Sequence, residues 1–267
     1  MSILSFLLIL VVAFLAGVEG VLDEFQFHQP LVACALIGLV SGHLTEGILL
    51  GGYLQMMALG WANVGAAVAP DVALASIASG ILMVQGLTSS LDPNLVISGA
   101  IGVAIPLSVI GLFLTKICRT KAITLVQNMD AAAQTGNIRK MEFWHRCGIV
   151  MQGCRVMIPA LILLWIPASW IAAGLESLPL WLLEGLQAAR GLIPALGFAI
   201  VINVLASKET WVFFALGFCL ACIQSLSLVA LSILGAGMMI IYMILKKGEA
   251  DGPQIELGDI LDSSKDR

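Results

Sequence analysis

Long apolar runs are the feature that most limits how this sequence can fold. Residues 3–22 and 95–115 form two such runs, each about as long as a helix that crosses the roughly 30 Å hydrocarbon core of a bilayer. Of all residues, 60% are hydrophobic and 11% are charged, whereas a soluble domain has about 25% charged residues. One globular core cannot bury so much apolar surface. The sequence therefore predicts an all-α, polytopic integral membrane protein.

Other apolar runs are too short or too interrupted to form one straight span. Residues 30–42 begin at a proline, which suits a first helical turn, and stop well short of a bilayer's thickness. Residues 47–85 are too long for one span and rather short for two. We expect a discontinuous helix that breaks around residues 60–70, together with re-entrant hairpins. The spacing Gly47-x-x-x-Gly51 predicts close contact between two helix backbones.

The second half of the chain continues the pattern of apolar runs. Two further runs occupy residues 156–173 and 191–207, separated by residues 174–190. Residues 211–245 fit either one long tilted helix or a two-armed hairpin. We predict a single transmembrane domain over residues 1–245, followed by a polar, disordered tail over residues 246–267.

Lysine and arginine are absent before residue 116 and then gather in one stretch. Residues 116–146 hold Lys116, Arg119, Lys121, Arg139, Lys140 and Arg146. The positive-inside rule predicts that this stretch is cytoplasmic, and its pattern predicts amphipathic helix with a break at residues 134–137. Lys246 and Lys247 place the C-terminal tail on the same side. Nothing resembles the mixture of basic and aromatic residues typical of nucleic-acid binding, so no nucleic-acid partner is expected.

A polar segment, residues 23–29, interrupts the apolar N-terminal region. Unpaired charges cost at least several kcal/mol in hydrocarbon, so these side chains need partners or a function. If the segment is helical, Asp23 pairs with Gln26 and Glu24 pairs with His28. A re-entrant turn at the membrane surface, with no ligand, is the alternative interpretation.

A second group of polar residues follows in the same N-terminal region. Gln55, Asn63 and Asp71 interrupt apolar sequence, and Trp61 lies among them. Carboxylates and amides supply the acceptors and donors that sugar hydroxyls need, while an aromatic face covers the C–H side of a sugar ring. We therefore predict a substrate-binding site formed by Asp23, Glu24, Gln26, His28, Gln55, Trp61, Asn63 and Asp71.

Other kinds of site fit the residues less well. Membrane carboxylates also serve proton relays and Na⁺ sites, so an ion-coupled sugar transporter that acts alone is the alternative function. A metal site formed by Glu24, His28 and Asp71 has no recognisable ligand spacing. No serine or cysteine stands in a nucleophile motif, so we expect no catalytic residue, no metal and no cofactor. A purely structural subunit, whose partner makes all sugar contacts, is a third hypothesis.

Two longer segments carry a resemblance to a known family. The sequences Leu22-Asp-Glu-Phe-Gln-Phe-His-Gln-Pro-Leu31 and Ala58-Leu-Gly-Trp-Ala-Asn-Val-Gly-Ala-Ala-Val-Ala-Pro-Asp71 closely resemble the IIC subunit of the mannose/sorbose family of the bacterial phosphoenolpyruvate-dependent sugar phosphotransferase system. The family's gram-negative mannose and sorbose members tend to have glutamate at the position that matches Gln55. The glutamine keeps an acceptor, gains donors and loses a charge.

The resemblance implies a subunit that binds and translocates a mannose-class hexose in the bacterial plasma membrane. Its implied partners are a membrane subunit IID and the phosphocarriers IIA and IIB, which hold the phosphohistidines. The resemblance thus implies a transport subunit rather than an enzyme, organised as a trimer of IIC–IID pairs with broken helices. Some relatives are docking sites for bacteriocins, which makes bacteriocin docking a further expectation.

Overall fold

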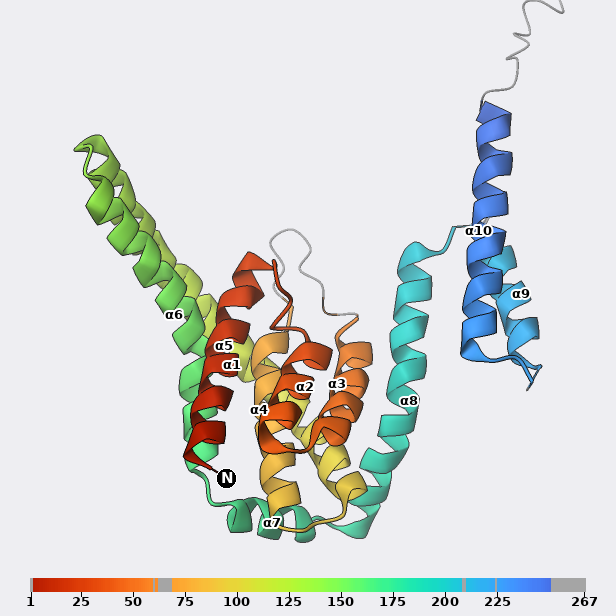
Figure 1. Ribbon diagram of the computed structural model, residues 1–267, viewed down its shortest axis with the longest axis horizontal. Coiled ribbons are helices and arrows are strands. Elements are labelled where there is room, and N and C mark those ends of the chain that lie inside the picture. The colour runs from red at the N-terminus through yellow and green to blue at the C-terminus, as the bar shows by residue number, and fades with distance from the viewer. Residues whose placement is uncertain (1, 60, 62–68, 208–209, 224, 251–267) are drawn as a thin grey trace, which may run out of the picture. The chain divides into compact units, whose positions relative to one another are not determined.

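The computed structural model describes residues 2–59, 61, 69–207, 210–223 and 225–250, and every regular element in these ranges is an α-helix (Figure 1). Within them, five helical segments are long and apolar enough to cross a membrane: α1 (Ile3–Leu22), α5 (Pro93–Gln134), α6 (Ile138–Trp165), α8 (Leu180–Leu205) and residues Val229–Lys246 of α10 (Leu228–Ala250). The prediction of an all-α, polytopic membrane protein is confirmed.

The first helices begin and end where the sequence predicts. Helix α1 covers the whole first apolar run, and the Ser2 hydroxyl caps it by accepting a hydrogen bond of 3.0 Å from the Ser5 N–H. Helix α2 (Pro30–Ser41) starts at the proline, whose missing N–H costs nothing in a first turn. The polar segment 23–29 therefore lies between two helices.

Helices α2 and α3 (Leu44–Ala58) form a tight antiparallel pair. A Cβ atom added at Gly47 would lie 2.5 Å from the Cys34 carbonyl oxygen, and one at Gly51 would lie 2.8 Å from the Leu31 Cα. Only glycine lets the two backbones approach this closely. The predicted packing role of Gly47 and Gly51 is confirmed.

Helix α4 (Val72–Thr88) lies at the centre of the N-terminal region. It packs against α1, α2, α3, α5, α6 and the short α7 (Ala168–Glu176). Its side chains Ile77, Ile81 and Met83 are fully buried. Because α3 ends at Ala58 and α4 starts only at Val72, the predicted break in this helical region is confirmed. The re-entrant hairpins remain a prediction.

Helices α5 and α6 form a long hairpin around the basic stretch. Helix α5 continues without interruption from its apolar part to Gln134, so the expected span over residues 95–115 and the expected cytoplasmic helix are one element. The turn lies at residues 135–137, as predicted, with Gly136 at φ 66°. Figure 1 shows the far ends of α5 and α6 extending together beyond α1.

Prolines divide the chain after α6 at points that hydropathy alone does not show. The apolar run over residues 156–173 does not correspond to one helix, and the separating stretch over 174–190 is partly helical. Helix α6 ends at Trp165, α7 follows Pro167, and α8 begins directly after Pro179. The residue before a proline is disfavoured in helical conformation, which ends the preceding helix.

The chain divides into two compact units, Met1–Val204 and Leu205–Arg267. In the second unit, α9 (Trp211–Ala221) and α10 form the two-armed hairpin, with the rings of Phe213 and Tyr242 5.4 Å apart. Helix α10 runs to Ala250, so the first residues of the expected tail are helical, and residues 251–267 lie outside the described part. The single domain predicted over residues 1–245 stays a prediction.

Candidate transport site

The buried carboxylate of Glu19 holds the turn that follows α1. One oxygen of Glu19 accepts hydrogen bonds from the backbone N–H groups of Glu24, at 3.0 Å, and Phe25, at 2.7 Å. Asp23 adopts the left-handed conformation, with φ 56°, and directs the chain out of the helix. Glu19 is 5% exposed. Its position at the end of an apolar run was the signal for this structural role, which sequence reasoning did not assign.

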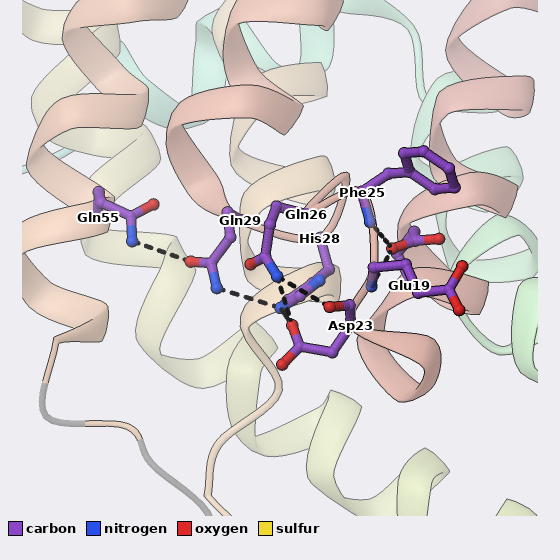
Figure 2. A network of polar contacts seen from close by, with 8 residues as sticks. Glu19, Asp23, Phe25, Gln26, His28, Gln29 and Gln55 are labelled. Atoms are coloured by element: carbon purple, nitrogen blue, oxygen red, sulfur yellow. Dashed lines mark hydrogen bonds and ion pairs between the residues drawn. The ribbon is translucent and has the colours of Figure 1, made fainter.

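A chain of polar contacts joins the segment 23–29 to α3 (Figure 2). The Gln26 amide donates to the Asp23 carboxylate at 2.8 Å, and His28 Nε2 lies 3.5 Å from the same carboxylate oxygen. His28 Nε2 also shares a hydrogen bond of 3.2 Å with the Gln29 amide nitrogen. Gln55 Nε2 donates to Gln29 Oε1 at 2.9 Å. Four side chains from one turn are thereby fixed relative to α3.

The partner of His28 differs from the one that the sequence suggested. The expected Asp23–Gln26 contact is present, but the acid beside His28 is Asp23 rather than Glu24. The helical spacing behind the Glu24–His28 pair fails because the left-handed Asp23 breaks the helix there. Glu24 is exposed.

Burial and charge act in opposite directions on His28, which lies outside the spanning helices. Burial lowers the pKa of the imidazole from its usual 6.5, and Arg155 acts in the same direction, whereas Asp23 and Glu19 oppose it. The Asp23 carboxylate and the Gln29 amide both contact the same ring nitrogen, Nε2. Nδ1 is buried and has no hydrogen-bond partner among the described residues.

A second polar cluster joins α4, α5 and α6. Asp71 caps α4, with one carboxylate oxygen accepting the Leu74 N–H at 3.0 Å, and the other oxygen forms an ion pair with Arg155 of α6. The Thr115 hydroxyl of α5 donates to Asp71 at 3.0 Å and accepts from Arg155 Nη1 at 2.6 Å. The Asp71 and Arg155 side chains are 6% and 3% exposed. Each member of this buried ion pair also makes hydrogen bonds, Asp71 with Leu74 and Thr115 and Arg155 with Thr115.

A cavity of about 500 Å³ lies between the two clusters. Its polar and aromatic lining consists of His28, Gln29, Trp61, Asp71, Thr115, Arg119, Gln152 and Arg155. The volume falls within the range of roughly 300–1,000 Å³ that small-molecule sites occupy. The cavity thus offers imidazole, amide, hydroxyl and guanidinium groups for hydrogen bonding beside one aromatic face.

The structure divides the predicted site residues into three groups. His28, Trp61 and Asp71 line the cavity together. Gln55 supports the lining residue Gln29, while Asp23, Glu24 and Gln26 lie on the exposed side of the turn, away from the lining. Asn63 lies outside the described residues. Within the described residues, no group of three or more His, Cys, Asp or Glu side chains could hold a metal ion.

Sequence reasoning missed the contribution of α5 and α6 to this cavity. Thr115, Arg119, Gln152 and Arg155 are all lining residues from these two helices. Arg155 directly precedes an apolar run and follows the basic stretch, so it could have been suspected as an intramembrane base. Thr115 gives no such signal, because threonine is ordinary in a spanning helix.

A multi-spanning helical protein with a polar cavity among its helices has the architecture of a membrane transport protein. Residues 3–241 match the family described as "PTS system sorbose-specific IIC component". The chain belongs to this family, the IIC components of the bacterial sugar phosphotransferase system (PTS). It is thus a membrane transport subunit rather than an enzyme, and the phosphotransferase hypothesis is favoured over an ion-coupled transporter.

Several relatives are similar over almost their whole length. The "PTS system mannose-specific EIIC component" of Escherichia coli (strain K12) is 42% identical over 243 residues, covering 91% of this chain and 89% of that protein. The "Fructose permease IIC component" of Bacillus subtilis (strain 168) is 41% identical over 253 residues, covering 94% and 91%. The family resemblance inferred from the two sequence segments is confirmed.

Two solved structures resemble the chain, each at 40% identity and each covering 91% of this chain and 96% of theirs. One, described as "Structure of membrane protein", has a TM-score of 0.81. The other is the cryo-electron microscopy structure of the mannose transporter ManYZ in complex with microcin E492, with a TM-score of 0.58. Both support the helical membrane architecture.

Proposed function

We propose that the cavity between the two polar clusters binds a mannose-class hexose for transport. The observation that carries this proposal is the shared lining: His28 and Gln29 come from the first polar segment, while Trp61 and Asp71 come from the region between α3 and α4. These two segments also carry the family resemblance. The Trp61 face suits the C–H side of a sugar ring, and the amide and imidazole groups suit its hydroxyls.

The relatives support a hexose as the substrate class. Their names specify mannose, fructose and sorbose, which are hexoses of similar size that differ in hydroxyl and carbonyl positions. A site with several donors and acceptors discriminates such isomers, because a mismatched hydroxyl leaves a buried polar group unpaired. We propose mannose as the first substrate to test, with fructose and sorbose as competitors.

We propose for this chain the partners that the family resemblance implies. The chain pairs with a IID membrane subunit, and three such pairs form the assembly. IIA and IIB carry the phosphoryl group that is transferred to the sugar. A solved relative is a complex of ManYZ with microcin E492, which supports bacteriocin docking as a further property to test.

We place the protein in the bacterial plasma membrane with the α5–α6 turn on the cytoplasmic side. The far part of this hairpin carries Lys121, Arg139 and Lys140, all exposed, and the positive-inside rule favours the cytoplasm for such residues. The C-terminal tail then lies on the same side.

The proposed site is tested by binding of labelled mannose to the protein purified with its IID partner. Gln29→Leu should weaken binding about tenfold, because it removes polar groups that face the cavity and leaves Gln55 Nε2 without its acceptor. Gln127→Leu is the matched control, since Gln127 is an exposed residue of α5 outside the lining.

In cells, uptake and phosphoenolpyruvate-dependent phosphorylation of labelled mannose should be lower for the Gln29→Leu protein than for the Gln127→Leu protein. Equal mannose affinity of the Gln29→Leu and Gln127→Leu proteins would show that the sugar binds elsewhere. Accumulation of unphosphorylated sugar, driven by an ion gradient, would contradict the phosphotransferase function itself.

A further inference from the structure

The charges around the cavity do not match a neutral sugar. Two guanidinium groups, Arg119 and Arg155, line the cavity together with one carboxylate, Asp71. The third basic side chain of the lining is His28, whose pKa is lowered by burial. Hydroxyl groups do not need an excess of cationic donors, whereas a phosphate monoester, with a charge of about −1.5 to −2 at pH 7, does.

Arg155 retains hydrogen-bonding capacity despite its ion pair. Its Nη1 atom contacts Asp71 and Thr115, but its buried Nε has no partner among the described residues. His28 Nδ1, on the opposite cluster, is also buried and without a partner there. Both atoms are closed off from solvent and from the cavity, so a ligand there would meet the outer nitrogens of the guanidinium groups that line it.

Arg119 completes the cationic part of the lining from the surface. Thr115, Arg119 and Ala122 lie on one face of α5, at spacings of four and three residues, and all three line the cavity. Arg119 is exposed and makes no ion pair within the described part of the chain. Because it belongs to the basic stretch assigned to the cytoplasmic side, it marks the side from which a phosphoryl donor would approach.

The beginning of α4 adds a further favourable field for an anion. Val72 and Ala73, the first residues of this 17-residue helix, line the same cavity. The amino end of a helix carries a partial positive charge and N–H groups that lack partners within the helix. The Asp71 carboxylate caps this end and offsets part of its positive charge, while the two arginines add to the field beside it.

We propose that Arg119 and Arg155, with the first turn of α4, bind the phosphoryl group of the hexose phosphate formed at this site. Arginine suits this role because its planar guanidinium donates two parallel hydrogen bonds to phosphate oxygens. The inference rests on the proposed function, because it requires the sugar to occupy the same cavity. The chain would thus hold the product's charge while partner proteins carry the transferable phosphate.

The test compares binding of mannose and mannose 6-phosphate to the protein purified with its IID partner, at constant ionic strength. The unmodified protein should bind mannose 6-phosphate more tightly than mannose. Arg119→Ala should weaken mannose 6-phosphate binding about tenfold more than it weakens mannose binding. Arg119→Lys should give an intermediate affinity, because it keeps the charge and loses the two-fold hydrogen bonding.

Lys121→Ala is the matched control, since it removes the same charge from an exposed position of α5 outside the lining. If Lys121→Ala and Arg119→Ala weakened mannose 6-phosphate binding equally, the effect would come from long-range electrostatics. That result would contradict a phosphate site at Arg119. Failure of the unmodified protein to bind mannose would refute the proposed function. Mannose binding with no preference for its phosphate would refute this inference alone.

A lipid headgroup carries the same phosphoryl chemistry, so the measurement is repeated in nanodiscs of zwitterionic lipid and of phosphatidylglycerol. A product site predicts the same Arg119-dependent affinity for mannose 6-phosphate in both membranes. If phosphatidylglycerol co-purifies in an Arg119-dependent manner and abolishes the phosphate preference, the arginines bind lipid and the proposal is wrong.

Discussion

The two polar clusters beside the cavity differ in how their polar groups are paired among the apolar helices. The cluster of Asp71, Thr115 and Arg155 is a buried ion pair that joins three helices. The cluster around His28 is a chain of mostly neutral hydrogen bonds within one turn, anchored to α3 through Gln55. Asp23, its charged member, is 69% exposed.

The difference indicates which cluster contributes most to the stability of the fold and which cluster can change its hydrogen-bond partners. A buried charge that loses its partner is far more costly than an exposed one, because no water replaces the lost contact. The ion-pair cluster should therefore determine whether the helices assemble. The neutral cluster should tune affinity, because amides and an imidazole can exchange partners at low cost.

The largest expected effect is on Arg155. Arg155→Met leaves the Asp71 carboxylate buried without its cation and should destabilise the protein by about 3–5 kcal/mol, measured by thermal unfolding of the purified complex. Arg146→Met is the control, because the Arg146–Glu142 pair is exposed and contributes about 0.5 kcal/mol or less.

Adding Asp71→Asn to Arg155→Met should recover part of the loss, since asparagine removes the charge and still caps α4. Equal stability of the Arg155→Met and Arg146→Met proteins would remove the distinction between the clusters.

A smaller effect is expected for Gln55. Gln55→Leu removes the donor to Gln29 Oε1 and the acceptor of the Leu31 N–H, at 2.9 and 3.3 Å. Because both partners are partly accessible to water, the loss should be about 1 kcal/mol, read as a lower unfolding temperature. Mannose affinity should fall more than stability does, since Gln29 loses its support. A fall in stability without a change in affinity would assign Gln55 to the fold alone.

Asp23 should matter less still. Asp23→Asn tolerates the left-handed backbone at this position and keeps an acceptor for Gln26, while removing the charge beside His28. Exposed charge pairs contribute about 0–1 kcal/mol, so unfolding should shift by less than 1 kcal/mol. If Asp23→Asn lowered the free energy of unfolding as much as Arg155→Met does, the two clusters would contribute equally to stability.

The smallest predicted effect is a dependence on pH through His28. The groups acting on it are Asp23 and Glu19, which raise its pKa, and Arg155, which lowers it, while burial dominates and lowers it from 6.5. The unfolded chain therefore binds the proton more readily than the folded protein does. Stability should be constant above pH 6.5 and decrease as pH falls below it. His28→Gln should remove that part of the decrease, measured by unfolding between pH 5 and 8; an unchanged profile would contradict the assignment.

Much of the helical pattern could be predicted because the bilayer imposes length and the prolines impose boundaries. Residues 3–22, the start at Pro30 and the turn near Gly136 follow from these local rules. The break after Trp165 did not, because a proline by itself does not fix the end of a helix: Pro106, Pro159 and Pro194 lie inside α5, α6 and α8, whereas Pro167 follows the end of α6.

Three of the eight polar and aromatic lining residues could be predicted and five could not. His28, Trp61 and Asp71 stood out because polar and aromatic groups in short interrupted segments are costly unless they are used. Thr115, Arg119 and Gln152 belong to long regular helices, where position on a face decides whether a side chain meets the cavity.

The sequence by itself determined that the chain is a helical membrane protein, which family it resembles and which two segments carry its polar groups. Those conclusions rest on composition and local spacing, which need no knowledge of packing. Only the tertiary structure decided that Asp71 is neutralised by Arg155, that His28 faces Asp23, and that Arg119 meets the cavity. These pairings join residues 40 or more positions apart or depend on one left-handed turn, and no short-range pattern encodes them.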